Sequence, residues 1–403
     1  MIYRPEYLDK VKKYANTPVI KVLTGMRRCG KSTILKQFYN GLIADNINPE
    51  NIVFINMESL EFDLIKSYND LYNFVKQKIH GKNGKCYILI DEVQEISEWE
   101  KAVASFLADD WGDIYITGSN AHLLSSELAT LLSGRYIEIP IYPLCFAEYL
   151  EFRKFPQNGN LDFEFQQFLK YGGLPGIHSL IDDEEVILSY INSILNTVMF
   201  KDVVVRNKIR DVALLEKICR YLTDNCGNIT SAKGIADYFK SQNIKISVDT
   251  VINYISVLEK AFLFYRVSRY DIKGKRFLEI NDKLYLGDHG LRNGLIGHKD
   301  SDISSVLENL VFLELKKQGY KVSVGILGDS EIDFIAEKGN AKLYIQVCYL
   351  LSEAKTVQRE FGNLKNITDN YPKIVLSLDK FFPADHEGIK HYYLPEFLRT
   401  KSF

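Results

Sequence analysis

The sequence predicts an α/β fold that begins with a parallel sheet and a phosphate-binding loop. Residues 19–24, VIKVLT, form an apolar, β-branched run, and GMRRCGKST follows directly at residues 25–33. Apolar residues then recur at helical spacing in ILKQFYNGLI, residues 34–43. A second apolar run, residues 87–90, ends in the carboxylates Asp91 and Glu92. A strand, a glycine loop and a helix in this order are typical of a P-loop.

The loop carries the residue types that hold a nucleotide. Backbone N–H groups of such a loop surround the phosphates, and the helix N-terminus adds the positive end of its dipole. Lys31 is expected to reach the β- and γ-phosphates, and Ser32 to ligate Mg²⁺. Two arginines, Arg27 and Arg28, make the loop cationic, and their side chains could face solvent, a phosphate or an acidic group. The expected binding residues are Gly25, Met26, Arg27, Arg28, Cys29, Gly30, Lys31, Ser32 and Thr33.

The two carboxylates fit the chemistry of nucleotide hydrolysis. A buried strand that ends in two acids is costly unless both have partners. Beside a P-loop, Asp91 would join the Mg²⁺ shell and Glu92 would activate water as a general base. The alternative is an exposed turn that carries two acids.

Three more strands are expected around the acidic one. They cover residues 51–58, 113–121 and 136–139. Ser119 and Asn120 lie at the carboxyl end of the second of these, where a polar side chain can sense the γ-phosphate or hold water, although Gly-Ser-Asn is also ordinary turn chemistry. Arg135 precedes the last strand and is either an arginine finger for a neighbouring subunit or a surface arginine.

Together these segments resemble one prokaryotic family of AAA+-type ATPases. The resemblance is carried by GMRRCGKST, ILIDEVQEI, ITGSNAHLLSSEL, LSGRY and YGGLP, and it covers nearly the whole chain. Members of that family carry this ATPase module before a C-terminal region of unknown function. The resemblance implies Mg-ATP as the ligand and assigns the nucleotide site to Lys31, Ser32, Asp91, Glu92 and Asn120 or Ser119, with Arg135 at the position of a possible finger.

Composition limits the surroundings in which the protein is expected to work. A net charge of −2 excludes a global polyanion-binding field, so a nucleic-acid surface must be local. The six cysteines are scattered without a zinc-type spacing, which favours a reduced, cytoplasmic protein. MIYRPEYLDK lacks an apolar signal core, and no apolar run approaches 18 residues, so no membrane partner is expected.

The middle of the chain predicts a helical lid and then a winged helix. Helices are expected at residues 161–171 and 184–206, with YGGLP between them. Two capped helices starting near residues 231 and 247 precede a hairpin around Gly274, an order typical of a winged helix. Its basic residues suit DNA phosphates, although winged helices often dock proteins instead. These residues are Arg266, Arg269, Lys273, Lys275 and Arg276.

The C-terminal part resembles the restriction-endonuclease-like fold. Glu308, Asp333 and Gln346 match the acidic and Glu/Gln positions of that fold, but Cys348 stands where an active nuclease has lysine. The carboxylates of such a site hold Mg²⁺ and the lysine supports the attacking water. A thiol is a poor substitute for an ammonium there, so the sequence predicts a degenerate nuclease site, although Glu331, Asp333 and Glu308 could still hold a metal.

We therefore predict four parts: a P-loop ATPase domain (1–145), a helical lid (146–210), a winged helix (211–299) and a nuclease-like α/β domain (300–403). The expected function is Mg-ATP hydrolysis that drives a remodelling step, associated with double-stranded DNA. The alternatives are a nucleotide-dependent switch that acts on a protein partner, and an ATP-licensed metal nuclease. A homo-oligomer is a further expectation.

Overall fold

The structure is a computed structural model that describes residues 2–121, 134–278, 281–297, 302–400 and 403. The chain forms two compact units. The first comprises Met1–Ile141 with Lys260–Phe262, and the second comprises Tyr142–Glu259 with Leu263–Phe403. The predicted lid, winged helix and nuclease-like part thus belong to one unit, and the finer boundaries between them stay predictions.

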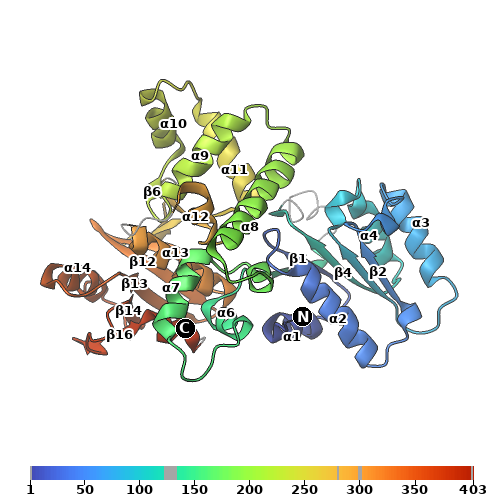
Figure 1. The fold of residues 1–403 in the computed structure, drawn as a ribbon, viewed down its shortest axis with the longest axis horizontal. Helices are drawn as coiled ribbons and strands as arrows, with labels where there is room; N and C mark the ends of the chain where they lie inside the picture. The colour runs from blue at the N-terminus through green and yellow to red at the C-terminus, as the bar shows by residue number, and fades with distance from the viewer. Residues whose placement is uncertain (1, 122–133, 279–280, 298–301, 401–402) are drawn as a thin grey trace. The chain divides into compact units, whose positions relative to one another are not determined.

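A five-stranded parallel sheet forms the centre of the first unit (Figure 1). All of its neighbouring strands run parallel, so their carboxyl ends meet at one edge. The strand order is β2-β3-β4-β1-β5, and the five strands predicted for this part of the chain are confirmed. The bounds are β1 (Ile20–Thr24), β2 (Ile52–Asn56), β3 (Tyr87–Asp91), β4 (Asp113–Gly118) and β5 (Tyr136–Pro140).

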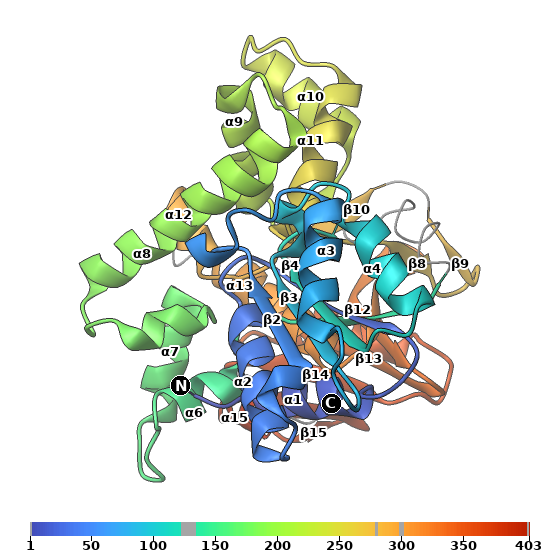
Figure 2. The same ribbon diagram turned by 90° about the vertical axis from the view of Figure 1, so that its right-hand side faces the viewer.

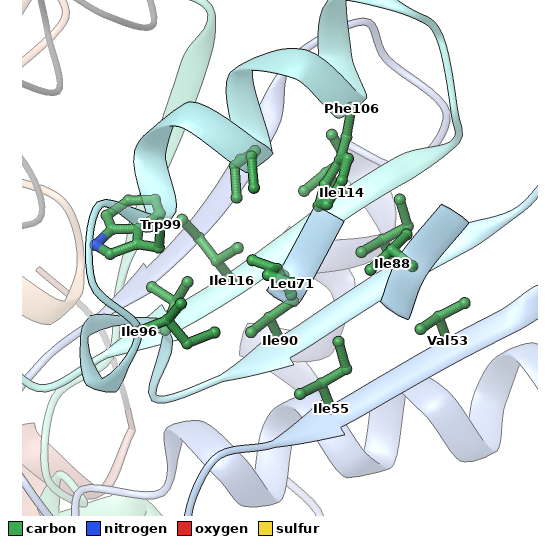
Figure 3. Packing of buried hydrophobic residues seen from close by; sticks show 14 of the residues in the cluster. Val53, Ile55, Leu71, Ile88, Ile90, Ile96, Trp99, Phe106, Ile114 and Ile116 are labelled. Atoms are coloured by element: carbon green, nitrogen blue, oxygen red, sulfur yellow. The ribbon is translucent and has the colours of Figure 1, made fainter. Parts of the chain in front are cut away.

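Two pairs of helices cover this sheet. Because successive strand residues point to opposite faces, β3 contributes Ile88 and Ile90 to one core and Leu89 to the other. Figure 3 shows the first of these cores, where Leu71 and Trp99 lie over the isoleucines of the strands. The helices on that face are α3 (Tyr68–Ile79) and α4 (Trp99–Ala108), and those on the opposite face are α1 (Pro5–Lys13) and α2 (Lys31–Ala44).

The second unit starts with helices. The helix predicted at residues 161–171 is confirmed as α7 (Leu161–Tyr171). The one predicted at 184–206 consists of α8 (Glu184–Thr197) and a π-helical turn (Val198–Val205). Three further helices gather in one part of the unit (Figure 2). Their bounds are α9 (Val212–Asp224), α10 (Ala232–Ser241) and α11 (Val248–Lys260).

The predicted caps and hairpin are confirmed, but the strands divide differently from the prediction. Ser231 caps α10 and Ser247 caps α11 through hydrogen bonds to backbone N–H groups. The apolar run of residues 262–270, which forms the first arm of the predicted hairpin around Gly274, contributes to two sheets. Its first part pairs in the order β6-β10-β7, with β6 (Ile229–Thr230), β7 (Phe264–Val267) and β10 (Asp282–Leu286). Its second part forms the hairpin of β8 (Arg269–Asp271) and β9 (Arg276–Phe277).

That hairpin extends an eight-stranded sheet at the C-terminal end of the chain. β8 runs parallel to β11, so the predicted basic wing is an edge of this sheet. The strand order is β15-β16-β14-β13-β12-β11-β8-β9, with β11 (Lys321–Leu327), β12 (Ser330–Lys338), β13 (Ala341–Val347), β14 (Lys373–Ser377), β15 (Asp385–His386) and β16 (Ile389–Tyr393). The remaining helices of the unit are α6 (Phe146–Phe152), α12 (Leu291–Ile296), α13 (Ile303–Lys317), α14 (Ala354–Lys365) and α15 (Leu394–Arg399).

Candidate nucleotide site

The glycine loop joins β1 to the N-terminus of α2, as predicted. Gly25 has a φ of 144° and Gly30 a φ of 108°, and both values disfavour a residue with a side chain. A Cβ atom on Gly25 would lie 2.1 Å from the carbonyl oxygen of Ile141. The Arg4 guanidinium donates a hydrogen bond to the Cys29 carbonyl at 3.0 Å, which anchors the loop from outside. The loop shape therefore depends on its glycines and on contacts with distant residues.

Lys31 is buried at the start of α2 and points back into the loop. Its Nζ donates to the carbonyl oxygens of Gly25 and Met26 at 3.0 and 3.1 Å. The same Nζ lies 3.7 Å from Oε1 of Glu92. The ammonium is thus shared between the loop carbonyls and the candidate base.

Asp91 and Ser32 lie together, as a shared magnesium site requires. The Ser32 hydroxyl is hydrogen-bonded to the Asp91 carboxyl. The Thr117 hydroxyl donates to Asp91 Oδ1 and accepts from the Glu92 N–H, so the end of β4 fixes both acids. Burial raises the pKa of Asp91 above its ordinary value. A cation at this position would offset that cost.

Glu92 is held by several polar partners at once. Burial alone would raise its pKa, but the charges of Lys31 and Arg27 bring the pKa below the ordinary value. Its Oε2 accepts hydrogen bonds from Ser119 Oγ at 3.2 Å and from the amide of Gln94. Glu92 is therefore ionised near neutral pH and oriented, which are two requirements of a general base.

The other residues predicted for the nucleotide site differ in their burial and contacts. Asn120 is buried beside Ser119 after β4. Arg27 is nearly buried and forms an ion pair with Glu58 at 3.3 Å, so of the three surroundings left open for this arginine, the acidic one is found. Arg28 and Thr33 are exposed.

Arg135 is exposed and directly precedes β5. The segment between Asn120 and Arg135 includes residues 122–133, which lie outside the described residues. It contains most of the HLLSSEL and LSGRY parts of the family motif.

The five predicted DNA-contacting residues differ in their surroundings. Arg266 forms ion pairs with Glu259 at 2.9 Å and with Asp282 at 3.3 Å, so two carboxylates already neutralise its charge. Arg269 is half-buried in β8. The exposed cations of the hairpin, which we call the hairpin cations, are Lys273, Lys275 and Arg276.

The predicted nuclease residues line a cavity of about 770 Å³ in the second unit. Glu308 and Glu331 both form ion pairs with Lys283, at 2.8 and 2.7 Å. Asp333 accepts from the backbone N–H of Val347 at 2.7 Å. Gln346 and Cys348 also line the cavity; Cys348 is buried, and burial raises the pKa of its thiol. No group of three or more histidines, cysteines or acids suited to a metal ion occurs among the described residues.

Sequence reasoning missed two polar residues at these sites. Gln94 follows the acids by two positions, but no spacing rule indicated that its side chain would turn back. Lys283 lies in β10, a strand that the sequence analysis did not identify, 25 residues from Glu308. The short apolar run LYL in DKLYL, residues 282–286, was the available signal for that strand.

The chain is similar to known proteins over most of its length. Residues 17–150 match a family described as an AAA domain, and residues 162–302 match a domain of unknown function. An uncharacterized protein of Haemophilus influenzae is 38% identical over 99% of this chain and 98% of its own length. Another from Methanocaldococcus jannaschii is 33% identical over 87% of this chain and 82% of its own.

Among solved structures, a Walker-type ATPase of Pyrococcus abyssi aligns with a TM-score of 0.54. The alignment covers 73% of this chain and 96% of that one at 16% identity, so it bears on the fold alone. In the part of the chain that the structure describes, no helix is both long enough and apolar enough to span a membrane.

Proposed function

Because this chain belongs to the AAA+-type ATPase family, we propose that it binds Mg-ATP at the loop of residues 25–33 and hydrolyses it. The observation that carries this proposal is the position of Lys31 between the loop carbonyls and Glu92. Lysine is the phosphate-binding residue of a P-loop, and a carboxylate opposite it is placed to meet water at the γ-phosphate. Both groups lie at the sheet edge where α/β proteins bind ligands.

The roles of the individual residues follow from their surroundings. Lys31 would exchange its carbonyl partners for phosphate oxygens and so release its hold on Glu92. Glu92 would take a proton from the attacking water. Ser119 would orient Glu92 through its hydrogen bond to Oε2, and the buried Asn120 beside it would contact the γ-phosphate or the water. Mg²⁺, held by Ser32 and Asp91, would neutralise phosphate charge. The remaining predicted loop residues would act through their backbone N–H groups.

Nucleotide binding is tested with a Lys31→Ala variant. We expect its affinity for a fluorescent ATP analogue with Mg²⁺ to fall about tenfold or more, because a charge-assisted contact to phosphate is lost. Lys36→Ala is the matched control, since Lys36 is an exposed lysine of the same helix and should bind as the wild type does. Equal affinity of the two variants would contradict the assignment of the site.

Hydrolysis is proposed to act on duplex DNA through the hairpin cations. They are exposed, and they lie on one tight hairpin whose turn is fixed by hydrogen bonds from the Lys273 and Gly274 N–H groups to Asp271. Clustered cations of this kind contact backbone phosphates without reading sequence. Arg266 is left out of this surface because of its two ion pairs.

A second candidate, a switch that acts on a protein partner, is favoured by the outer face of α11. The exposed residues there include Val248, Ile252 and Asp249, and none of these is a cation. An apolar and acidic face suits a protein surface better than DNA phosphates.

One experiment separates the two candidates. If DNA is the partner, duplex DNA should raise ATP turnover, and a variant with all three hairpin cations changed to alanine should lose this stimulation but keep basal turnover. Turnover that is indifferent to DNA in the wild type would favour the protein partner instead.

A homo-oligomer is also proposed, because an exposed arginine such as Arg135 can complete a neighbour's site. Arg135→Ala should then leave the assembled mass unchanged while turnover falls. A fall in turnover of a strictly monomeric protein would argue against action in a neighbouring site.

We further propose that the cavity of the second unit has lost nuclease activity. The ammonium of Lys283 neutralises two of the carboxylates that line it, and Cys348 supplies no cation. Metal-dependent cutting of DNA that Asp333→Ala abolishes would overturn this and support the ATP-licensed nuclease.

A further inference from the structure

Gln94 lies directly beside the proposed base because of an unusual turn. Glu92 adopts a φ of 54° and a ψ of 50°, a left-handed conformation that a non-glycine residue rarely takes. A 3-10 turn, Val93–Glu95, follows at once. This turn brings the side chain of Gln94 back to Glu92, and its amide Nε2 donates a hydrogen bond to Glu92 Oε2. Residues in such a sparsely populated backbone conformation cluster at active sites and ligand-binding segments.

The other end of the Gln94 amide, its oxygen Oε1, has no hydrogen-bond partner among the residues that the structure describes. This oxygen is buried. The orientation of the amide is fixed by chemistry, because an ionised carboxylate only accepts hydrogen bonds and therefore faces the NH₂ group. A buried acceptor without a donor is costly and is seldom retained without a ligand or a water.

We propose that Gln94 Oε1 binds the attacking water together with Glu92, which makes Gln94 a catalytic residue of the proposed ATPase. This inference rests on the proposed function. The amide oxygen and nitrogen share one carbon, so Oε1 lies within reach of a single water held by the Glu92 carboxylate. Such a water would donate one O–H to Glu92 and the other to Gln94. Its lone pair is then aimed away from both acceptors.

In the hydrolysis step, the water oxygen forms a bond to the γ-phosphorus as the bond from that phosphorus to the bridging oxygen of ADP breaks. The water proton passes to Glu92, and Gln94 neither gains nor loses a proton. ATP and water are the only reactants. Ser119 and Lys31 contact Glu92 itself, since Ser119 donates to Glu92 Oε2 and Lys31 Nζ lies 3.7 Å from Oε1.

The test uses the full-length protein with Gln94→Met, which keeps the length of the side chain and removes both polar atoms. We expect kcat for ATP to fall about 10- to 100-fold, because the water is no longer oriented. The affinity for a fluorescent ATP analogue with Mg²⁺ should change less than about twofold, since the hydrogen bond of Gln94 goes to Glu92 and the proposed phosphate contacts come from the loop. Gln77→Met is the matched control, because Gln77 is an exposed glutamine of α3 and should leave both quantities unchanged.

Two results would overturn the inference. One is a Gln94→Met variant with the kcat of the wild type. The other is a loss that appears in nucleotide affinity or in the melting temperature, which would indicate a structural role. If wild type and Lys31→Ala both fail to turn over ATP, the proposed function fails and this inference falls with it. If Lys31→Ala alone is inactive and Gln94→Met is normal, only the inference fails.

Discussion

The Glu92→Gln variant should bind ATP as the wild type does and turn it over at least about 100-fold more slowly. The Glu92 carboxylate lies 3.7 Å from Lys31 Nζ and is the group that accepts a proton from water in the proposed mechanism. Glutamine keeps the shape of the side chain and its hydrogen bond from Ser119, but it cannot take the proton. The measurement is steady-state phosphate release beside equilibrium binding of a fluorescent ATP analogue.

A matched control for this variant is Glu95→Gln. Glu95 is an exposed acid in the turn that follows Glu92, so its neutralisation removes the same charge from the same region. It should leave turnover near the wild-type value. Normal hydrolysis by Glu92→Gln would show that another group is the base.

The largest expected effect on stability comes from Asp113, at the opposite end of the sheet from the nucleotide site. Lys21 and Asp113 form a fully buried ion pair between β1 and β4. Asp113 also accepts hydrogen bonds from Tyr115 OH at 2.9 Å and from the Asn16 N–H at 2.7 Å. Lys21 donates to the Thr17 carbonyl at 2.9 Å. The pair is costly to bury and is stable only because each member is satisfied.

Asp113→Ala should therefore lower the free energy of unfolding of the first unit by about 3–5 kcal/mol, because it leaves the Lys21 ammonium buried without its counter-charge. The chain has two tryptophans, Trp99 and Trp111, and both lie in the first unit. Tryptophan fluorescence during urea denaturation thus follows that unit alone.

The double variant Lys21→Met with Asp113→Leu serves as the control. It removes both charges and should lose less stability than Asp113→Ala. If the double variant is the less stable of the two, the buried charge is not the cause.

Much of the nucleotide site could be predicted because its signals are local. The strand, glycine loop and helix around Lys31 are contiguous, and Asp91 and Glu92 end a strand whose burial shows in its composition. The parallel order of the strands then brings these segments to one edge.

The features that escaped prediction depend on contacts between distant residues or on backbone conformation. The apolar run at residues 262–270 gives no sign that it divides between two sheets, because periodicity does not record which strand is the neighbour. The cations near residue 270 looked alike in the sequence, but the ion pairs of Arg266 could not be inferred from its position. The left-handed turn at Glu92 that brings Gln94 to the base has no residue signature such as glycine.

Hydrolysis at the glycine loop is tested by phosphate release from ATP by the wild-type protein, with and without Mg²⁺ and beside Lys31→Ala. We expect Mg²⁺-dependent release by the wild type and none above background by the variant, because Lys31 and the Ser32–Asp91 pair act on the same nucleotide. Equal release by wild type and Lys31→Ala, or no release by either, would contradict it.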